Sequence, residues 1–328
     1  MKNYMKIVAK FYLLALLLAV SMPLAAQEVF SVLATKGDVQ LQRKGEGAWI
    51  KVFTGAKLNK NDNIKLGEGA YLGLVHLKSG KAKEIRNPGT IALSELDKQM
   101  SATSSVGSKV VAYVTQDITG SSTKFQDYRK SMANLGSIER ATKGTVTPDL
   151  PRKTSLMDSI VTFNWITDKR AKEAAQQSGY VFEISNRMGT PIYTKETKDT
   201  FVVINLERLN LKHGEHYYWR VNLKENMNAN EEDAQPFTLL DNSTRRSIQH
   251  DLKAFNEEEP SPLNKIMLAR YFESKDLIMD AMKAYQEAIK MAPDVVEYRE
   301  LYAMFLDRHE MNFLANKVRQ EAVASLNR

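Results

Sequence analysis

The side chains with the types and spacing to bind a metal ion lie in one short run, His213-Gly214-Glu215-His216. Of the 5 histidines, only these two come within metal-binding reach of each other along the chain. A catalytic zinc ion usually takes three protein ligands and keeps an open position. Because two histidines are too few and the run leads into a predicted strand, we interpret it as an exposed turn and predict no metal site.

Oxygen-rich runs have the residue types for two other kinds of chemistry. Residues 59–63, Asn-Lys-Asn-Asp-Asn, carry alternate oxygen ligands as calcium loops do, but they lack the sharp-turn Gly and the closing Glu of an EF-hand. A tight turn is the alternative that we favour. Carboxylate runs at residues 231–233 and 257–259 would serve in acid–base catalysis only if one carboxyl group of a pair were desolvated. We interpret both as solvated loops.

The composition removes several classes of function. The chain of 328 residues has 0 Cys, which excludes a disulfide framework, thiolate-bound zinc or iron–sulfur clusters, and a cysteine nucleophile. It contains no Gly-x-Ser-x-Gly and no His-Glu-x-x-His motif. We therefore predict no catalytic residue, no cofactor and no metal, and we expect a protein that is not an enzyme.

The first 26 residues have the order of a secretory signal peptide. Lys2, Lys6 and Lys10 precede an apolar run at residues 11–20, and residues 24–27, Leu-Ala-Ala-Gln, offer a cleavage site. The apolar run is shorter than the about 20 residues that cross a bilayer, and no later segment approaches that length. We predict an exported protein, periplasmic or associated with the outer membrane, with no transmembrane segment beyond the signal peptide. An uncleaved anchor is the alternative.

The excess of basic over acidic residues is concentrated in one part of the chain. Removing the three lysines of the predicted signal peptide lowers the net charge from +7 to +4, and residues 28–150 carry 18 Lys and Arg against 12 Asp and Glu. The densest basic stretch is a candidate contact with an anionic glycan, lipid headgroup or partner surface: Lys78, Lys81, Lys83 and Arg86. A solvated strand face is the alternative that we favour. Because we expect an exported protein, we predict no nucleic-acid partner.

Residues 27–100 are predicted to form a β domain, because short runs of alternating apolar residues recur between Gly and Asn/Asp turns. The order of turn and core residues resembles the periplasmic domain of the FecR family: Gly37, Val39, Trp49, Gly55, Leu58, Asp62, Ile64, Ala70, Leu72, Leu74 and Gly80. The resemblance implies a small extracytoplasmic β module used for contacts. Regulators of this family also carry a sigma-factor-binding tail, and this chain departs from them by having a signal peptide and no such tail.

Residues 101–150 shift to a composition rich in Ser, Thr and Lys and are predicted to be a helical connector. Val110, Val111, Val114 and Ile118 fall at helical spacing. The last part, residues 145–151, contains two prolines that disfavour helix at the residue before each of them. We expect an extended linker there.

Residues 151–242 contain β-rich runs separated by polar loops, which predicts a β-sandwich. Trp165 in an early strand and Tyr217-Tyr218-Trp219-Arg220-Val221 in a late strand resemble the fibronectin type III and bacterial immunoglobulin-like pattern. The resemblance implies a fold and no activity. Tyr217 and Trp219 share one face of a strand, from which aromatic rings can stack on a sugar. Core packing of at least one face is the alternative that we favour.

Residues 243–328 are predicted to be helical, because apolar residues recur at three- and four-residue spacing. Positions over a period of about 34 residues resemble the tetratricopeptide pattern: Leu268, Ala269, Phe272, Ala281, Tyr285, Ala288 and Pro293. A second copy has Arg319 where an aromatic residue belongs, but it keeps Tyr302, Ala303, Leu306, Ala315 and Ala322. We expect the partner contact on exposed helix faces of this region, at Tyr271, Lys275, Tyr302 and Arg308.

Together these features predict a multidomain protein with all-β and α parts: a FecR-like β domain, a helical connector, an immunoglobulin- or fibronectin-like β-sandwich and C-terminal tetratricopeptide-like helical hairpins. The predicted function is that of a non-enzymatic cell-envelope scaffold or adaptor that binds other envelope proteins. The alternative is a carbohydrate- or peptidoglycan-associated protein that contacts polysaccharide through the basic first domain and the sandwich aromatics. A hydrolase of envelope polymers is a third hypothesis.

Overall fold

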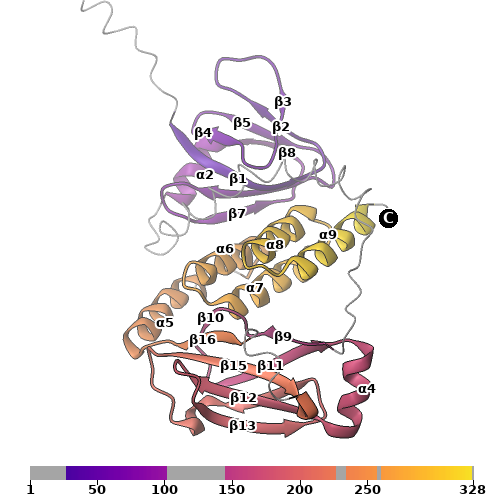
Figure 1. Cartoon of the computed structure of the whole chain (residues 1–328). Coiled ribbons are helices and arrows are strands. Elements are labelled where there is room, and N and C mark those ends of the chain that lie inside the picture. Colours follow the sequence, from indigo (N-terminus) through magenta and orange to yellow (C-terminus); the bar gives the residue numbers. More distant parts are fainter. Residues whose placement is uncertain (1–26, 102–144, 227–233, 257–259, 327–328) are drawn as a thin grey trace, which may run out of the picture.

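The computed structural model of the chain describes residues 27–101, 145–226, 234–256 and 260–326. These residues form four β-sheets and a set of α-helices (Figure 1), so the fold combines β and α parts as predicted. The predicted signal peptide and residues 102–144 of the predicted connector lie outside the described residues.

The first β unit, residues 28–100, consists of two antiparallel sheets with the strand orders β4-β1-β6-β7 and β3-β2-β5-β8. Phe30, Leu58 and Leu72 are fully buried in the core between the sheets, and helix α2 (Leu93–Met100) adds Leu96 to it. The strands are β1 (Glu28–Lys36), β2 (Val39–Gln42), β3 (Ile50–Lys51), β4 (Lys57–Asn59), β5 (Asn63–Leu66), β6 (Tyr71–His76), β7 (Ala82–Ile85) and β8 (Gly89–Ala92).

The turn between β1 and β2 depends on a glycine. Gly37 has φ +76°, a conformation that side-chain-bearing residues rarely adopt, and a Cβ added there would lie 3.2 Å from Ala70 Cα. The turn carries the chain from one sheet to the other, where Leu41 on β2 pairs with Ile64 on β5. Both side chains therefore point into the core, as the alternating pattern of the strands predicts.

The second β unit, residues 146–239, is a sandwich of two sheets with the orders β10-β16-β15-β12-β13 and β14-β11-β9. Helix α4 (Lys169–Ser178) links β11 to β12. Asp168 is its N-cap residue, and the Asp168 carboxylate accepts a hydrogen bond from the Ala171 N–H at 2.7 Å. The strands are β9 (Val146–Leu150), β10 (Thr154–Leu156), β11 (Ile160–Thr167), β12 (Tyr180–Asn186), β13 (Pro191–Thr197), β14 (Phe201–Asn205), β15 (His216–Leu223) and β16 (Gln235–Leu239).

Aromatic rings fill the sandwich core. The rings of Phe163, Phe182 and Trp219 contact one another, and the Trp219 indole donates a hydrogen bond to the Pro151 carbonyl at 2.7 Å. Trp219 is fully buried and Tyr217 is 4% exposed. Both rings therefore pack in the core, and neither offers a surface on which a sugar can stack.

The structure extends the sandwich into the predicted linker. Residues 146–150 form β9, which pairs antiparallel with β11. The sequence does not predict this strand, because Pro148 has no N–H to donate to a β-ladder. The tertiary fold shows that β9 is an edge strand, and a proline is tolerated at an edge.

The C-terminal part is a helical unit that repeats its geometry at an interval of 34 residues. The first hairpin has helices starting at Pro262 and Ile278, and the second has helices starting at Val296 and Asn312. Asp276 and Glu310, also 34 residues apart, both adopt positive φ at the two hairpin turns. The helices are α5 (Asn242–Asn256), α6 (Pro262–Glu273), α7 (Ile278–Met291), α8 (Val296–Arg308) and α9 (Asn312–Leu326).

The helical unit lies between the two β units, although it comes last in the sequence (Figure 1). Its apolar core is continuous with side chains from β1 and β6 of the first β unit: Leu33, Ala34, Tyr71 and Val75. Short helices are marginally stable in water by themselves. Burial against both β units therefore stabilises this part of the chain. No helix in the described ranges has the length and apolar character to cross a membrane.

Candidate functional site

Polar contacts surround the apolar junction between the helical unit and the first β unit. The hydroxyl groups of Tyr71 on β6 and Tyr298 on α8 form a buried hydrogen bond. At the start of α6, the Leu263 N–H donates to Glu84 Oε1 at 2.8 Å. These contacts fix the face of α6 and α8 that is turned toward β6 and β7, so that face is not available to a partner.

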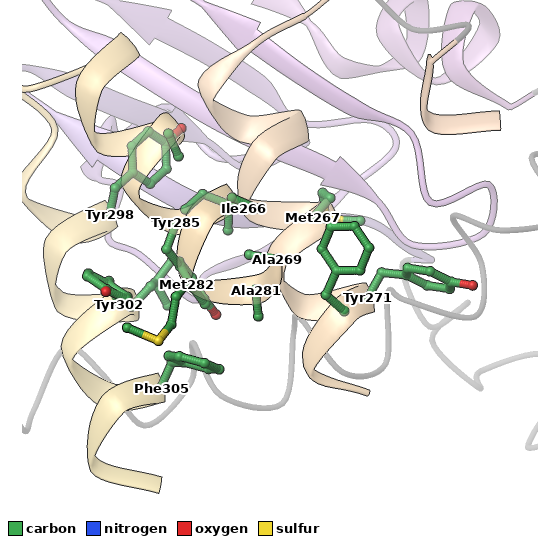
Figure 2. Close-up of a cluster of buried hydrophobic side chains, with 14 of the residues drawn as sticks. Ile266, Met267, Ala269, Tyr271, Ala281, Met282, Tyr285, Tyr298, Tyr302 and Phe305 are labelled. Atoms are coloured by element: carbon green, nitrogen blue, oxygen red, sulfur yellow. The ribbon is translucent and has the colours of Figure 1, made fainter. Parts of the chain in front are cut away.

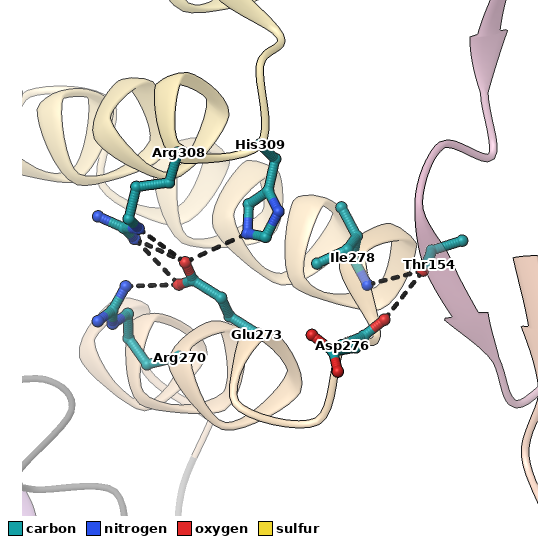
Figure 3. Close-up of polar contacts among 7 residues, drawn as sticks. All are labelled: Thr154, Arg270, Glu273, Asp276, Ile278, Arg308 and His309. Atoms are coloured by element: carbon teal, nitrogen blue, oxygen red, sulfur yellow. Dashed lines mark hydrogen bonds and ion pairs between the residues drawn. The ribbon is translucent and has the colours of Figure 1, made fainter. Parts of the chain in front are cut away.

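The sandwich holds the opposite side of the helical unit at its two hairpin turns, and Figure 3 shows the contact of Thr154 with the first turn. The Thr154 hydroxyl donates to the Asp276 carbonyl at 3.1 Å and accepts from the Ile278 N–H at 3.0 Å. At the second turn, Lys153 Nζ lies 2.5 Å from Glu310 Oε2. One segment of the sandwich thus contacts both turns, and a second side of the helical unit is occupied.

A groove remains on the side of the helical unit formed by α7, α8 and α9. It has a volume of about 300 Å³. Its apolar and aromatic lining comes from Ile289, Tyr302, Leu314 and Val318. Its polar lining residues are Gln286, Lys290, Arg299, Lys317 and Glu321. An apolar floor with polar residues around it is the kind of surface on which partner helices or peptides bind.

The charged lining of the groove is mainly basic. Lys290, Arg299 and Lys317 carry positive charge, and Glu321 alone opposes them. Lys290 and Lys317 are exposed and make no ion pair within the described part of the chain. The groove therefore complements an acidic partner, which its potential would attract during association.

Tyr302 is the one predicted contact residue that lines this groove. Its ring is 4% exposed and stacks on Tyr285 in the core shown in Figure 2. Its hydroxyl accepts a hydrogen bond from Gln286 Nε2 at 3.0 Å. Burial raises the pKa of Tyr302 to about 12, so the hydroxyl stays neutral near neutral pH. Tyr302 thus forms the floor of the groove and is not an exposed contact.

The expectation of an exposed Tyr271 is corrected by the structure. Tyr271 is 2% exposed, and its hydroxyl donates to Asp251 Oδ2 at 2.8 Å. Helical spacing shows which residues share a face, but it does not show how many faces are covered. Helix α6 is covered on several sides, so the Tyr271 ring is buried. Lys275 is exposed, with Nζ 5.7 Å from the centroid of the Tyr271 ring, and lies outside the groove.

Arg308 is engaged within the helical unit (Figure 3). Its guanidinium donates to Glu273 at 2.8 and 3.0 Å, and Arg270 and His309 also contact that carboxylate. Burial opposes ionisation of Glu273, but the hydrogen bonds from His309 and Arg308 and the charge of Arg270 outweigh it and lower its pKa. Arg308 therefore ties α8 to α6.

Two of the four basic residues of the predicted anionic contact, Lys83 and Arg86, line one cavity, and Lys78 and Lys81 do not line it. Lys78 is exposed and Lys81 is half-buried at the β6–β7 turn, whereas Lys83 and Arg86 lie on or after β7. Arg86 covers the Tyr71 ring at 4.5 Å and lies 3.7 Å from Glu84. Lys83 and Arg86 line a second cavity of about 600 Å³, in which Glu84 and Glu95 balance their charge.

The structure brings together a serine, a histidine and an aspartate that the sequence analysis missed. His76 Nδ1 lies 2.8 Å from Ser79 Oγ, and His76 Nε2 lies 3.0 Å from Asp97 Oδ1. These are the groups of a catalytic triad, but Ser79 is fully buried and His76 is 2% exposed. The group lines neither the groove nor the second cavity. It ties the β6–β7 turn to α2.

The candidate metal runs are occupied by internal hydrogen bonds. His213 Nδ1 donates to the Leu240 carbonyl at 2.8 Å, while His216 Nδ1 pairs with Thr238 Oγ1 at 2.7 Å. Asp62 is buried, its N–H donates to the Asn59 carbonyl at 3.2 Å to close a tight turn, and its carboxylate accepts from the Asn59 N–H at 2.9 Å. Among the residues that the structure describes, no three His, Asp or Glu side chains form a group able to hold a metal ion.

No protein-family model and no curated protein matches this chain. The resemblances to the FecR, fibronectin and tetratricopeptide patterns thus stay predictions from the sequence. The functional interpretation depends on the geometry of the groove and on the contacts that hold the helical unit.

Proposed function

We propose that this protein is an exported, non-enzymatic scaffold or adaptor of the cell envelope, and that its helical unit binds another envelope protein through the groove between α7, α8 and α9. In this proposal the first β unit is FecR-like, the sandwich is fibronectin-like and the helical hairpins are tetratricopeptide-like. The 34-residue interval of the hairpins supports the last of these assignments. The two β units hold the helices, and the groove is their accessible binding surface.

The observation that carries the proposal is the combination of an apolar floor with Lys290 and Lys317 at its edge, neither of which makes an ion pair with another described residue. Leu314 and Val318 are half-buried, so a partner that covers them removes apolar surface from water. Lys290 and Lys317 can then pair with carboxylates at the rim. The partner that fits is an amphipathic helix or extended segment with apolar anchors and acidic flanks.

The test is affinity capture from intact envelopes with charge-reversal variants. K290E/K317E should lose the captured partner, because the reversed charges repel acidic flanks without altering the buried core. K253E is the matched control, since Lys253 is an exposed lysine on α5, away from the groove. Equal capture by K290E/K317E and by the wild-type protein would contradict the proposal.

Point variants are better suited to this test than deletion of the C-terminal helices. The core of the helical unit includes Leu33, Tyr71 and Val75 of the first β unit. Removing the helices would expose these side chains and disturb the first β unit as well. A loss of binding after deletion would therefore not locate the binding surface.

The glycan-binding alternative has less support in the structure. Tyr217 and Trp219 pack in the sandwich core, so they provide no stacking platform. Glu84 and Glu95 line the same cavity as Lys83 and Arg86 and oppose their charge, which weakens the attraction of that cavity for an anionic glycan. Retention of wild-type polysaccharide affinity by K290E/K317E, with no protein partner, would favour this alternative.

A further inference from the structure

The sheet with the order β3-β2-β5-β8 turns its outer face away from the helical unit. The other sheet of the first β unit supplies side chains of β1 and β6 to the core of the helical unit, so the β3-β2-β5-β8 sheet lies on the far side (Figure 1). Val52 and Ile64 are buried in the core of the first β unit, and side chains alternate between the two faces of a strand. Their neighbours Lys51 and Lys65 therefore lie on the outer face, where both are exposed.

Cationic and aromatic side chains form one patch on this outer face at β3. Lys51 on β3 and Lys65 on β5 both pair in register with Gln40 on β2, which lies between them. Lys65 Nζ lies 5.9 Å from the centroid of the half-buried Trp49 ring. Phe53, two residues after Lys51, is 62% exposed. We call Trp49, Lys51, Phe53 and Lys65 the β3 patch.

The surroundings of the β3 patch are basic. Residues 39–66, from the start of β2 to the end of β5, carry 6 Lys and Arg against 2 Asp and Glu. One of the two acidic residues, Asp62, forms an ion pair with Arg43 at 2.8 Å. Lys44 and the two lysines of the patch are exposed, and they make no ion pair with another described residue. The patch therefore complements an anionic surface.

The apolar side chains of this region favour a lipid surface over an anionic glycan. Phe53 and Ile50, which is 47% exposed on the edge strand β3, are stabilised by transfer out of water, and the boundary between headgroups and acyl chains offers that transfer. Lys65 occupies the side of the Trp49 ring on which a sugar would stack. Tryptophan and lysine both suit a membrane interface, because each has an apolar body and a polar end.

We propose that the β3 patch binds an anionic phospholipid surface and holds the chain at a membrane. In this arrangement Trp49 and Phe53 enter the boundary between headgroups and acyl chains, and Lys51 and Lys65 contact the phosphates. Binding is reversible, because few apolar side chains take part. The patch and the groove belong to different units, so this proposal and the proposed function can fail separately.

Cosedimentation with phospholipid vesicles tests the proposal. The chain from residue 27 on is used, because the apolar run of the predicted signal peptide would bind vesicles by itself. It should bind vesicles of phosphatidylcholine mixed with phosphatidylglycerol, and pure phosphatidylcholine far more weakly. K51Q/K65Q should weaken binding about 25-fold, since each lysine near an anionic surface contributes about fivefold. F53S should weaken it as well. The matched control is K169Q/K172Q, which removes two exposed lysines of α4 in the sandwich and should bind as the wild type does.

Tryptophan fluorescence locates the contact. Of the 3 Trp, Trp165 is 3% exposed and Trp219 is fully buried, so Trp49 is the one that lipid can reach. Vesicles with brominated acyl chains should therefore quench part of the fluorescence of the wild type and none of that of W49F. Far-ultraviolet circular dichroism and the melting temperature check that every variant is folded.

Four results would overturn the proposal. The first is a wild-type chain that does not bind the phosphatidylglycerol vesicles, including one that binds a soluble anionic polysaccharide in their place. The second is wild-type affinity in folded K51Q/K65Q, and the third is an equal loss of affinity in K169Q/K172Q. The fourth is vesicle binding without quenching of Trp49.

Discussion

The Tyr71 hydroxyl on β6 and the Tyr298 hydroxyl on α8, 227 residues apart in sequence, form a buried hydrogen bond between the first β unit and the helical unit. Burial raises the pKa of both phenols, and Glu84 and Arg86 lie close enough to act on both of them. The pair therefore joins the first and last parts of the described chain.

Removing the Tyr71 hydroxyl should destabilise this junction. Y71F leaves the Tyr298 hydroxyl buried without its partner, which costs about 1–3 kcal/mol of unfolding free energy. Y71F/Y298F should recover part of that loss, because no unpaired donor then remains in the apolar junction. Urea denaturation of the two variants and of Y298F measures the coupling. Strictly additive losses would show that the two hydroxyls do not interact.

Substitution of Glu273 should destabilise the helical unit more than substitution of most of its other charged residues. E273Q removes the negative charge that Arg270 and Arg308 share, so buried Arg270 loses its ion pair with Glu273. Breaking a buried ion pair from one side typically costs about 3–5 kcal/mol. R308A should cost less, since its side chain is 34% exposed and water can replace part of its interaction. Denaturation midpoints compare the two, and a smaller effect of E273Q than of R308A would contradict this ranking.

The two junctions of the helical unit should be more stable at mildly acidic pH. Burial raises the pKa of Glu297, beside Thr35 on β1, to about 6. Burial and the charge of Asp158 raise the pKa of Asp280 on α7 to about 6 as well. A carboxyl group whose pKa is higher in the folded state stabilises the fold below its unfolded pKa, and this contribution is lost as pH rises through about 6.

The melting temperature should therefore rise between about pH 7 and about pH 5. Below that range the trend reverses, because carboxylates with lowered pKa values, such as Asp97 and Asp294, become protonated and lose their partners. E297Q/D280N removes both raised groups and should flatten the rise. A wild-type melting temperature that falls steadily from neutral pH to pH 5 would refute the assignment.

Ser79 should be unreactive despite its contact with His76. A fluorophosphonate probe, which labels activated serines, should not modify the native protein, because the Ser79 hydroxyl is fully buried. S79A should lower the melting temperature and change no other property. Labelling that S79A abolishes would revive the hydrolase hypothesis, as would turnover of an envelope polymer by the purified protein.

Partner binding at the helical groove should depend on salt. Exposed charges such as Lys290 and Lys317 are screened as ionic strength rises. Raising the salt concentration should therefore slow association and weaken capture, while K290E/K317E should remove most of this dependence. Salt-independent binding would show that the rim charges do not contribute.

Much of the architecture follows from local sequence patterns. Alternation places Leu41, Ile64 and Trp219 in the cores of the β units, and the helical spacing of Tyr285 and Phe305 indicates buried helix faces. The 34-residue period of the last helices is also visible in the sequence, because Ala281 and Ala315 recur where paired helices approach closely.

The candidate site was accessible to sequence analysis only in part. Helical spacing predicts Tyr302 as a contact residue, and Tyr302 lines the groove, but as a buried floor residue. Lys290 and Lys317 could not be predicted as site residues, because a single lysine on a helix has no distinguishing sequence pattern. Only the packing of neighbouring helices places both lysines around one groove. Tyr271 was placed on an exposed face because periodicity does not show how many sides of a helix are covered.

The order of residues along this chain thus determined which segments are strands and helices and which of their faces are apolar, since both depend on near neighbours. Only the tertiary structure decided that the last helices lie between the two β units, that Tyr71 meets Tyr298, and that His76 meets Asp97. Those relationships depend on packing between segments far apart in sequence. The docking of one apolar face on another is selected by shape and by pairing of buried polar groups, which no local pattern records.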